Sequence, residues 1–296
     1  MNIKINGYIA LLRPFTLLAP LIVSSSIMIT SLIYAGAVNL NMYQIIATII
    51  PASLCFALLN GASNALNQAT DFTEDKYSKP YRPIPKGVIS QKQAFNLSFS
   101  LYITALLLSV LINIAFSFLI LLIAFFSITY SLPPRTKKYL IINQLCVAIS
   151  RGFLGIIGSW AVFANPIESL PLAIGIISAL FLFGGTSTKD ILDSNADKKA
   201  GTKTLVNVFG LTKTSYFSLF FMGFAFLLII PLSMFHIIEI FFLPLSLLSI
   251  LSFFVYWLMT HSHKNEKYEN TSAWTLMYAT YFIFALSFTT LTIFFS

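Results

Sequence analysis

The chain has 296 residues, of which 57% are hydrophobic and only 9% charged, whereas soluble domains carry about 25% charged residues. This composition excludes a soluble domain with a membrane anchor and indicates one polytopic membrane domain over residues 1–296. The formal net charge of +8 would suggest nucleic acid in a soluble protein. Basic loops on one membrane face account for it here, and we expect no nucleic-acid partner.

Nine apolar segments predict an all-α bundle of nine transmembrane helices. They cover residues 15–38, 42–66, 94–115, 117–132, 139–163, 168–188, 214–235, 237–260 and 273–295. The first is interpreted as a membrane helix and not as a removed signal peptide, because no small-residue cleavage pattern precedes a soluble domain.

The basic residues between these segments predict the orientation. They lie before the first segment (Lys4, Arg13) and after the second (76–92), fourth (135–138), sixth (189–213) and eighth (Lys264, Lys267). With nine helices all these positions share one face, and the opposite loops contain no Lys or Arg. The positive-inside rule places this face and the N-terminus in the cytoplasm. We therefore expect a multi-pass protein of the cell membrane with a cytoplasmic active site.

An acidic run closes the second segment. Asn67, Asp71 and Asp75 follow one another at steps of four residues, so they share one face if the helix continues. The chain then becomes basic. Lys79 and Arg82 are candidates for phosphate contact, and the positive-inside rule explains most of the other cations in this loop.

Two polar side chains fall inside predicted helices. Asn64 continues the polar face of the second segment into the membrane, where it would either orient an acceptor or bond another helix. Arg151 lies half-way along the fifth segment, where a charge is costly and by default marks a functional site or a buried partner. It would meet an acidic group of an acceptor or pair with an aspartate.

A second acidic run closes the sixth segment. Asp193 and Asp197 repeat the four-residue step, with Lys189 and Asp190 directly before them, and Lys189 is a third candidate for phosphate contact. Two carboxylate pairs on one side would repel each other unless a cation lies between them. Mg²⁺ takes hard oxygen ligands, usually one or two carboxylates plus substrate phosphates. The predicted ligands of a Mg²⁺ site are Asp71, Asp75, Asp193 and Asp197.

The two acidic runs are also related to each other by position. Asp71 and Asp193 are 122 residues apart, as are Asp75 and Asp197. Each run ends an even-numbered segment and opens a long basic loop. This predicts an internal duplication of a four-helix unit, helices 1–4 and helices 5–8, with the ninth helix added.

Three stretches carry a family resemblance. The run NQATDFTEDKYSKPYRPIPKG from Asn67 to Gly87 resembles the first signature of the UbiA superfamily of intramembrane prenyltransferases, N-x-x-x-D-x-x-x-D followed by R-P-x-P-x-G. The run KDILDSNADKKAGTKTL from Lys189 resembles the second, D-x-x-x-D with a Gly-Thr-Leu-like segment. The stretch YSLPPRTK from Tyr130 to Lys137 resembles the family's Tyr-and-Lys loop. The resemblance covers nearly the whole chain.

The resemblance implies nine helices around a central cavity, with Mg²⁺ and a diphosphate at its cytoplasmic mouth and the prenyl tail in an apolar tunnel. Residue pattern and resemblance together give the candidate catalytic residues Asn67, Asp71, Asp75, Asp190, Asp193 and Asp197. The candidate substrate-binding residues are Asn64, Lys79, Arg82, Tyr130, Lys137, Arg151 and Lys189. Tyr130 is the aromatic candidate for stabilising an allylic cation, with an interfacial anchor as its alternative role.

The implied reaction is Mg²⁺-dependent transfer of a prenyl group from a polyprenyl diphosphate to a lipid-soluble acceptor. An aromatic quinone precursor is the first expected acceptor and geranylgeranylglyceryl phosphate the second. The alternative from another class is a membrane transporter of cations or organic anions, whose site would lie near the bilayer midplane. The acids gather on one side, which favours the enzyme. Oligomeric state and donor chain length stay open.

Overall fold

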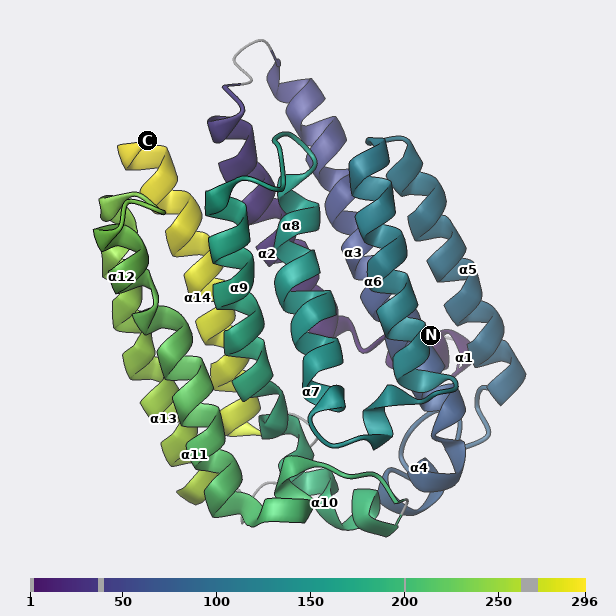
Figure 1. The fold of residues 1–296 in the computed structure, drawn as a ribbon. Helices are drawn as coiled ribbons and strands as arrows, with labels where there is room; N and C mark the ends of the chain where they lie inside the picture. The colour runs from purple at the N-terminus through teal and green to yellow at the C-terminus, as the bar shows by residue number, and fades with distance from the viewer. Residues whose placement is uncertain (1–2, 37–39, 200, 262–270) are drawn as a thin grey trace.

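The computed structural model describes residues 3–36, 40–199, 201–261 and 271–296, and within these ranges it contains helices and no strand (Figure 1). Nine helical spans there are long and apolar enough to cross a membrane. The predicted all-α bundle is therefore confirmed over the described ranges, and the chain is a multi-pass membrane protein. Residues 37 and 38 of the first predicted segment and the loop cations Lys264 and Lys267 lie outside these ranges.

The first half of the chain contains four spans and two short helices. Their bounds are α1 Ile3–Leu12, α2 Pro14–Tyr34, α3 Met42–Thr70, α4 Phe72–Ser78, α5 Gln91–Val110 and α6 Ile114–Ser131. Asn41 and Ser90 begin α3 and α5 with capping boxes, in which the cap side chain accepts from a backbone N–H of the helix and a glutamine Oε1 accepts from the backbone N–H of the cap residue. The sequence pattern does not predict α1, which packs against α3.

The second half contains five spans with several interruptions. The bounds are η1 Thr136–Lys138, α7 Ile142–Val147, η2 Ala148–Phe153, α8 Leu154–Trp160, α9 Ser169–Gly185, η3 Thr186–Lys189, α10 Asp190–Lys199, α11 Leu205–Leu227, α12 Ile229–Met234, η4 Ile240–Leu248, α13 Ser249–His261 and α14 Ser272–Phe295. Of these, η1, η3 and η4 are 3₁₀-helices and η2 is a π-helix.

Three predicted segments differ from the structure, and one of them, the eighth at 237–260, begins as the 3₁₀-helix η4 and continues as α13. The fifth, 139–163, is not one continuous α-helix, because the π-helical turn η2 separates α7 from α8. Such turns insert a residue into a helix and occur frequently at functional sites. The predicted start of the seventh segment at residue 214 is also wrong. Helix α11 begins at Leu205 and passes a break at Gly210, whose φ of 80° suits only glycine well.

Beside a small cluster at Leu11, Ala69 and Ala94, the core contains two larger apolar clusters that broadly follow the two halves of the chain. One cluster joins α3, α5 and α6 through residues such as Phe56, Tyr102 and Phe116. The other joins α8, α9, α11 and α14 through residues such as Trp160, Phe181 and Phe284. Helix α2 contributes to both. The repeat of helices 1–4 in helices 5–8 stays a prediction.

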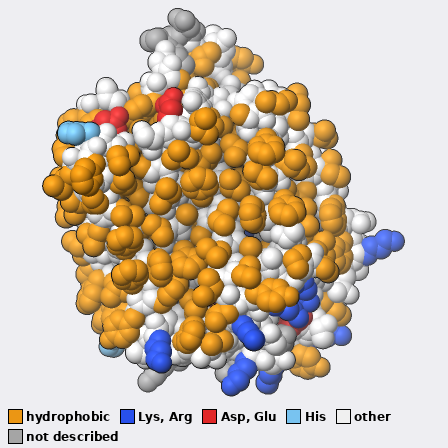
Figure 2. All heavy atoms as spheres, in the orientation of Figure 1, with side chains coloured by type: hydrophobic (Ala, Val, Ile, Leu, Met, Phe, Trp, Pro, Cys, Tyr) orange, Lys and Arg blue, Asp and Glu red, His pale blue; other side chains and the backbone are white. Residues whose placement is uncertain are grey.

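Lys and Arg side chains gather at one end of the molecule, beside a wide apolar belt (Figure 2). At this end α4 and α10 contact each other (Figure 1), and we call it the basic end. The belt exposes large apolar side chains, for example Leu107 at 66% and Phe118 at 59%. Such a belt matches the hydrocarbon of a bilayer. That the basic end faces the cytoplasm stays a prediction.

Candidate active site

A polar cavity with an empty volume of about 1290 Å³ lies at the basic end. Both acidic runs line it, the first from α3 and α4 and the second from α10. The structure thus brings together residues that are more than a hundred positions apart in the sequence. Its acidic lining residues are Asp71, Glu74, Asp75, Asp190, Asp193 and Asp197.

The first acidic run keeps its helical step through the end of α3. The backbone N–H of Asp71 donates to the Asn67 carbonyl at 3.0 Å, and that of Asp75 to the Asp71 carbonyl at 2.8 Å. Lys137 Nζ donates to Asn67 Oδ1 at 2.9 Å and also to Asp71 Oδ1. One cation therefore bridges the side chains of Asn67 and Asp71, which share a face as the spacing predicts.

Two further cations neutralise the first run. Arg135 Nη2 donates to Asp71 Oδ1 at 2.9 Å and lies 3.8 Å from Glu74 Oε1. Arg82 Nη1 donates to both carboxylate oxygens of Asp75, at 3.0 and 2.7 Å, and both side chains are buried. Burial raises the pKa of Asp75, and the Arg82 guanidinium opposes this rise. Arg82 thus pairs with a predicted metal ligand.

The second run is held on α10 and joined to the first loop. Lys79 Nζ donates to Asp193 Oδ2 at 2.6 Å, so a cation from the first basic loop reaches across to the second acidic run. Asp190 is 5% exposed, and its Oδ2 has no hydrogen-bond partner among the described residues. An orphaned buried carboxylate oxygen is costly unless a ligand supplies a proton or a cation.

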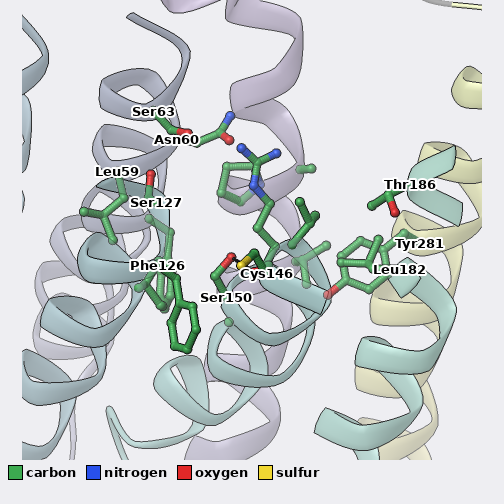
Figure 3. A pocket seen from close by; sticks show the side chains of 18 of the residues that line it. Leu59, Asn60, Ser63, Phe126, Ser127, Cys146, Ser150, Leu182, Thr186 and Tyr281 are labelled. Atoms are coloured by element: carbon green, nitrogen blue, oxygen red, sulfur yellow. Dashed lines mark hydrogen bonds between the residues drawn. The ribbon is translucent and has the colours of Figure 1, made fainter. Parts of the chain in front are cut away.

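A second, apolar cavity with an empty volume of about 1230 Å³ adjoins the polar one. Asn60, Ser63 and Ser127 lie together on one side of it, with Leu182, Thr186 and Tyr281 across from them (Figure 3). The residues that line both cavities mark their junction. They are Ser63, Tyr130, Arg151, Lys189, Trp274 and Tyr278.

Lys189 and Tyr130 meet at this junction. Lys189 Nζ donates to Tyr130 Oη at 3.0 Å and lies 5.4 Å from the ring centroid. The Tyr130 hydroxyl in turn donates to Asn143 Oδ1 at 3.0 Å. The chain Lys189–Tyr130–Asn143 fixes the orientation of the Tyr130 hydroxyl and leaves the ammonium group with further donor capacity toward the cavity.

Asn64 and Arg151 have different surroundings. The Asn64 amide donates to the Leu12 carbonyl and to Thr16 Oγ1, both at 2.9 Å, so it holds the turn between α1 and α2. Arg151 lies in η2 at the middle of the fifth span, yet its side chain is exposed because it faces the cavities. Within the described ranges Arg151 has no hydrogen bond or ion pair, so no aspartate pairs with it there.

Sequence reasoning missed several lining residues. Arg135 lies inside the stretch from Tyr130 to Lys137, and its ion pair with Asp71 is visible only in the structure. Asn143, Trp274 and Tyr278 gave no local signal. Trp274 and Tyr278 stack at 4.1 Å between ring centroids and bring α14, the ninth span, to the junction.

The donor set fits Mg²⁺ that arrives with a phosphate ligand. Carboxylate oxygens are the hard ligands that this ion prefers, and it is usually held by one or two carboxylates and by substrate phosphates. No cluster of three or more acidic, His or Cys side chains arranged as a complete metal cage occurs among the residues that the structure describes. The buried, unpartnered Oδ2 of Asp190 beside the polar cavity is consistent with a cation bound there.

The affinity for Mg²⁺ is expected to fall as the pH drops below about 7. Burial, with Asp190 and Asp193 nearby, raises the pKa of Asp197 to about 7, and only the deprotonated carboxylate binds a metal. Titrating Mg²⁺ in the presence of inorganic diphosphate between pH 6 and 8 measures this. In the variant Asp197→Asn the Mg²⁺ affinity should no longer change with pH over this range, because the titrating carboxyl group is absent. A flat affinity in the unsubstituted protein would contradict the prediction.

Comparisons with known proteins point to one family. The model of the UbiA prenyltransferase family matches residues 22–277. The digeranylgeranylglyceryl phosphate synthase of Methanosphaera stadtmanae is 28% identical over 208 residues, 70% of this chain and 71% of the relative. That of Methanococcoides burtonii is 31% identical over 210 residues, 67% and 73%. A UbiA homolog from Archaeoglobus fulgidus bound to GPP and Mg²⁺ has a TM-score of 0.70 at 21% identity, covering 97% of this chain and 98% of that one.

Proposed function

Since this chain belongs to the UbiA prenyltransferase family and is a membrane prenyltransferase, we propose that it transfers a prenyl group from a prenyl diphosphate to geranylgeranylglyceryl phosphate in the presence of Mg²⁺. The relatives named digeranylgeranylglyceryl phosphate synthase support this acceptor, the second expected from the sequence, over an aromatic ring. The observation that carries the site is the pairing of two acidic runs in one polar cavity that adjoins an apolar one.

The polar cavity would hold the diphosphate. The metal ligands would be Asp71, Asp75, Asp193 and Asp197, with Asn67 and Asp190 beside them. Bound Mg²⁺ would neutralise charge that builds on the leaving diphosphate. The basic side chains that pair with these acids now, among them Lys79 and Lys137, would turn to the diphosphate oxygens once the acids bind metal.

The junction would hold the carbon that reacts. The acceptor hydroxyl oxygen forms a bond to C1 of the prenyl group, and the bond between C1 and the diphosphate oxygen breaks with its electron pair leaving on diphosphate. The hydroxyl proton passes to the released diphosphate or to solvent. Lys189 would stabilise the leaving group from the polar side, and the faces of Tyr130, Trp274 and Tyr278 would stabilise positive charge on the allylic carbon.

The apolar cavity would hold the prenyl tail and exclude water from the reacting carbon. Its walls carry side chains such as Phe56, Phe126 and Leu182. The basic end would face the cytoplasm by the positive-inside rule. We also propose that the chain is one domain built from a duplicated four-helix unit, which the two larger clusters of the core support.

Radiolabel transfer from geranylgeranyl diphosphate in purified membranes tests the proposal. Geranylgeranylglyceryl phosphate, hydroxybenzoate, dihydroxynaphthoate and homogentisate are offered in turn, with Mg²⁺ and with a chelator. We expect labelled product with the glycerol phosphate, and none when Mg²⁺ is removed. Product with an aromatic acceptor alone would replace the proposed acceptor by the quinone precursor. Product that forms equally in the chelator would remove the metal assignment.

A further inference from the structure

Arg151 is the one cation at the junction that no described residue pairs with in a hydrogen bond or ion pair. Four cations from the loops already pair with acids of the polar cavity, namely Lys79, Arg82, Arg135 and Lys137. Lys189, the other junction cation, bonds Tyr130. Arg151 is exposed to the cavities from the middle of a membrane span, where an unpaired charge is costly.

The backbone holds Arg151 in this position. It lies within the π-helical turn η2, and the next residue, Gly152, packs directly on α9. A Cβ atom built on Gly152 would lie 2.6 Å from the Ala179 Cα and 2.8 Å from its backbone nitrogen. Only glycine allows this approach. The contact fixes η2 against α9, and the side chain of Arg151 lines both cavities.

On the side of the apolar cavity, the side chains around Arg151 include neutral polar groups and no carboxylate. No Asp or Glu of the described chain lines the apolar cavity. Across it, the hydroxyls of Tyr102 and Ser127 are 2.6 Å apart, and Ser63 lies within hydrogen-bonding reach of Tyr102. Ser63 and Ser127 lie side by side in Figure 3. These neutral groups would solvate a polar ligand without repelling an anion.

From this geometry we infer that Arg151 binds the anionic headgroup of the acceptor, a phosphate monoester if the proposed function holds. The inference rests on the proposed function for the identity of the acceptor only. A guanidinium group binds phosphate or carboxylate through two parallel hydrogen bonds. With its anion on Arg151, the acceptor would place its hydroxyl at the junction, and its tail would share the apolar cavity with the donor tail.

The donor diphosphate is a less suitable partner for Arg151. The polar cavity already contains cations from four other segments, namely Arg13, the first basic loop, η1 with its preceding residue, and η3. Arg151 comes from a fifth segment and also lines the apolar cavity, where a diphosphate would lose its contact with the acids. Of the two cations that line the apolar cavity, Lys189 already bonds Tyr130, which leaves Arg151 for the anion of an acceptor that approaches from this side.

The test compares Arg151→Gln and Arg151→Lys with the unsubstituted full-length protein. The acceptors are geranylgeranylglyceryl phosphate and its neutral analogue geranylgeranylglycerol. We expect Arg151→Gln to raise KM for the phosphate acceptor by about 10- to 100-fold and to leave KM for the neutral one within about twofold. Arg151→Lys should recover part of the loss, because it keeps the charge without the fork. Lys92→Gln, an exposed change outside both cavities, is the matched control.

Binding measurements separate the competing outcomes. The affinity for geranylgeranyl diphosphate with Mg²⁺ should stay within about twofold in Arg151→Gln. A weaker donor affinity with an unchanged acceptor KM would assign Arg151 to the donor, and unchanged kinetics with lower thermal stability would make it structural; either result overturns the inference. If the unsubstituted protein prenylates only a carboxylate-bearing ring, the proposed acceptor is wrong. The role of Arg151 is then tested by comparing the KM for that ring between the unsubstituted protein and Arg151→Gln.

If the unsubstituted protein transfers to no acceptor, the proposed function fails, and binding of the two glycerol probes alone decides the inference. The phosphate probe should then stabilise the unsubstituted protein against heating more than the neutral probe does, and this difference should vanish in Arg151→Gln. An equal difference in both proteins would overturn the inference.

Discussion

Replacing Asp71 or Asp193 with Asn is expected to abolish prenyl transfer while the protein still folds. Asn keeps the shape and an acceptor oxygen but removes the charge that would hold Mg²⁺. We expect a loss of at least about 100-fold in turnover, since even outer-sphere changes at metal sites cost about 10- to 100-fold. Both side chains lie at the mouth of the polar cavity and are partly exposed, 18% and 32%, so the fold should tolerate the change. Initial rates at saturating Mg²⁺ measure the effect.

A control at the opposite end of the bundle separates metal loss from a general charge effect. Glu168 precedes α9 in an exposed position and makes no side-chain cap bond. Glu168→Gln removes one negative charge as well and should leave the rate unchanged. Near-normal activity in Asp71→Asn or Asp193→Asn would remove the metal assignment. A lower unfolding temperature that accounts for the lost rate would make the residue structural.

Replacing Arg82 with Gln is expected to destabilise the fold by about 3–5 kcal/mol, because removal of one partner leaves a buried charge uncompensated. Arg82 and Asp75 are buried side by side and joined by two hydrogen bonds. Without Arg82, burial raises the pKa of Asp75 unopposed by that guanidinium. Asp75 would then take up a proton or move, and either response lowers the free energy of unfolding. Chemical unfolding in detergent micelles measures the loss.

A double variant tests whether the buried pair is the cause. Adding Asp75→Asn to Arg82→Gln removes the orphaned charge, and it should recover a large part of the lost stability without recovering activity. Lys86→Gln, in the same loop but exposed and outside both cavities, should cost less than about 0.5 kcal/mol. A stable Arg82→Gln variant that fails only to bind diphosphate would instead give Arg82 the phosphate role expected from the sequence.

Features that depend on local pattern could be predicted from the sequence. The nine spans follow from runs of apolar residues, and the shared face of Asn67 and Asp71 follows from a step of four on a helix. The meeting of the two acidic runs was predictable because both close even-numbered spans on the basic side. Each of these features can be predicted from a few neighbouring residues or from the rule that successive spans alternate in direction.

The partners of these residues could not be predicted in the same way. Lys79 and Asp193 form an ion pair across 114 positions of sequence, and no local pattern chooses Lys79 over the other lysines of its loop. Trp274 and Tyr278 look like membrane filler until α14 packs at the junction. The π-helical turn has no composition of its own, and the close contact of Gly152 with α9 is visible only in the folded structure. These features depend on tertiary packing.

The π-helical turn has a consequence for how acceptor preference could change among relatives of this chain. Deleting a single residue from η2 would restore a regular α-helix, and because the π-helical turn accommodates one extra residue, the helix on either side would keep its orientation while the side chains within the turn change direction. A different side chain would then face the junction, although every substitution-based comparison would show the segment nearly unchanged. Gain or loss of one residue within a membrane span would thus act as a switch between acceptor classes, and sequence alignments of this region should be read for gaps as well as for replacements.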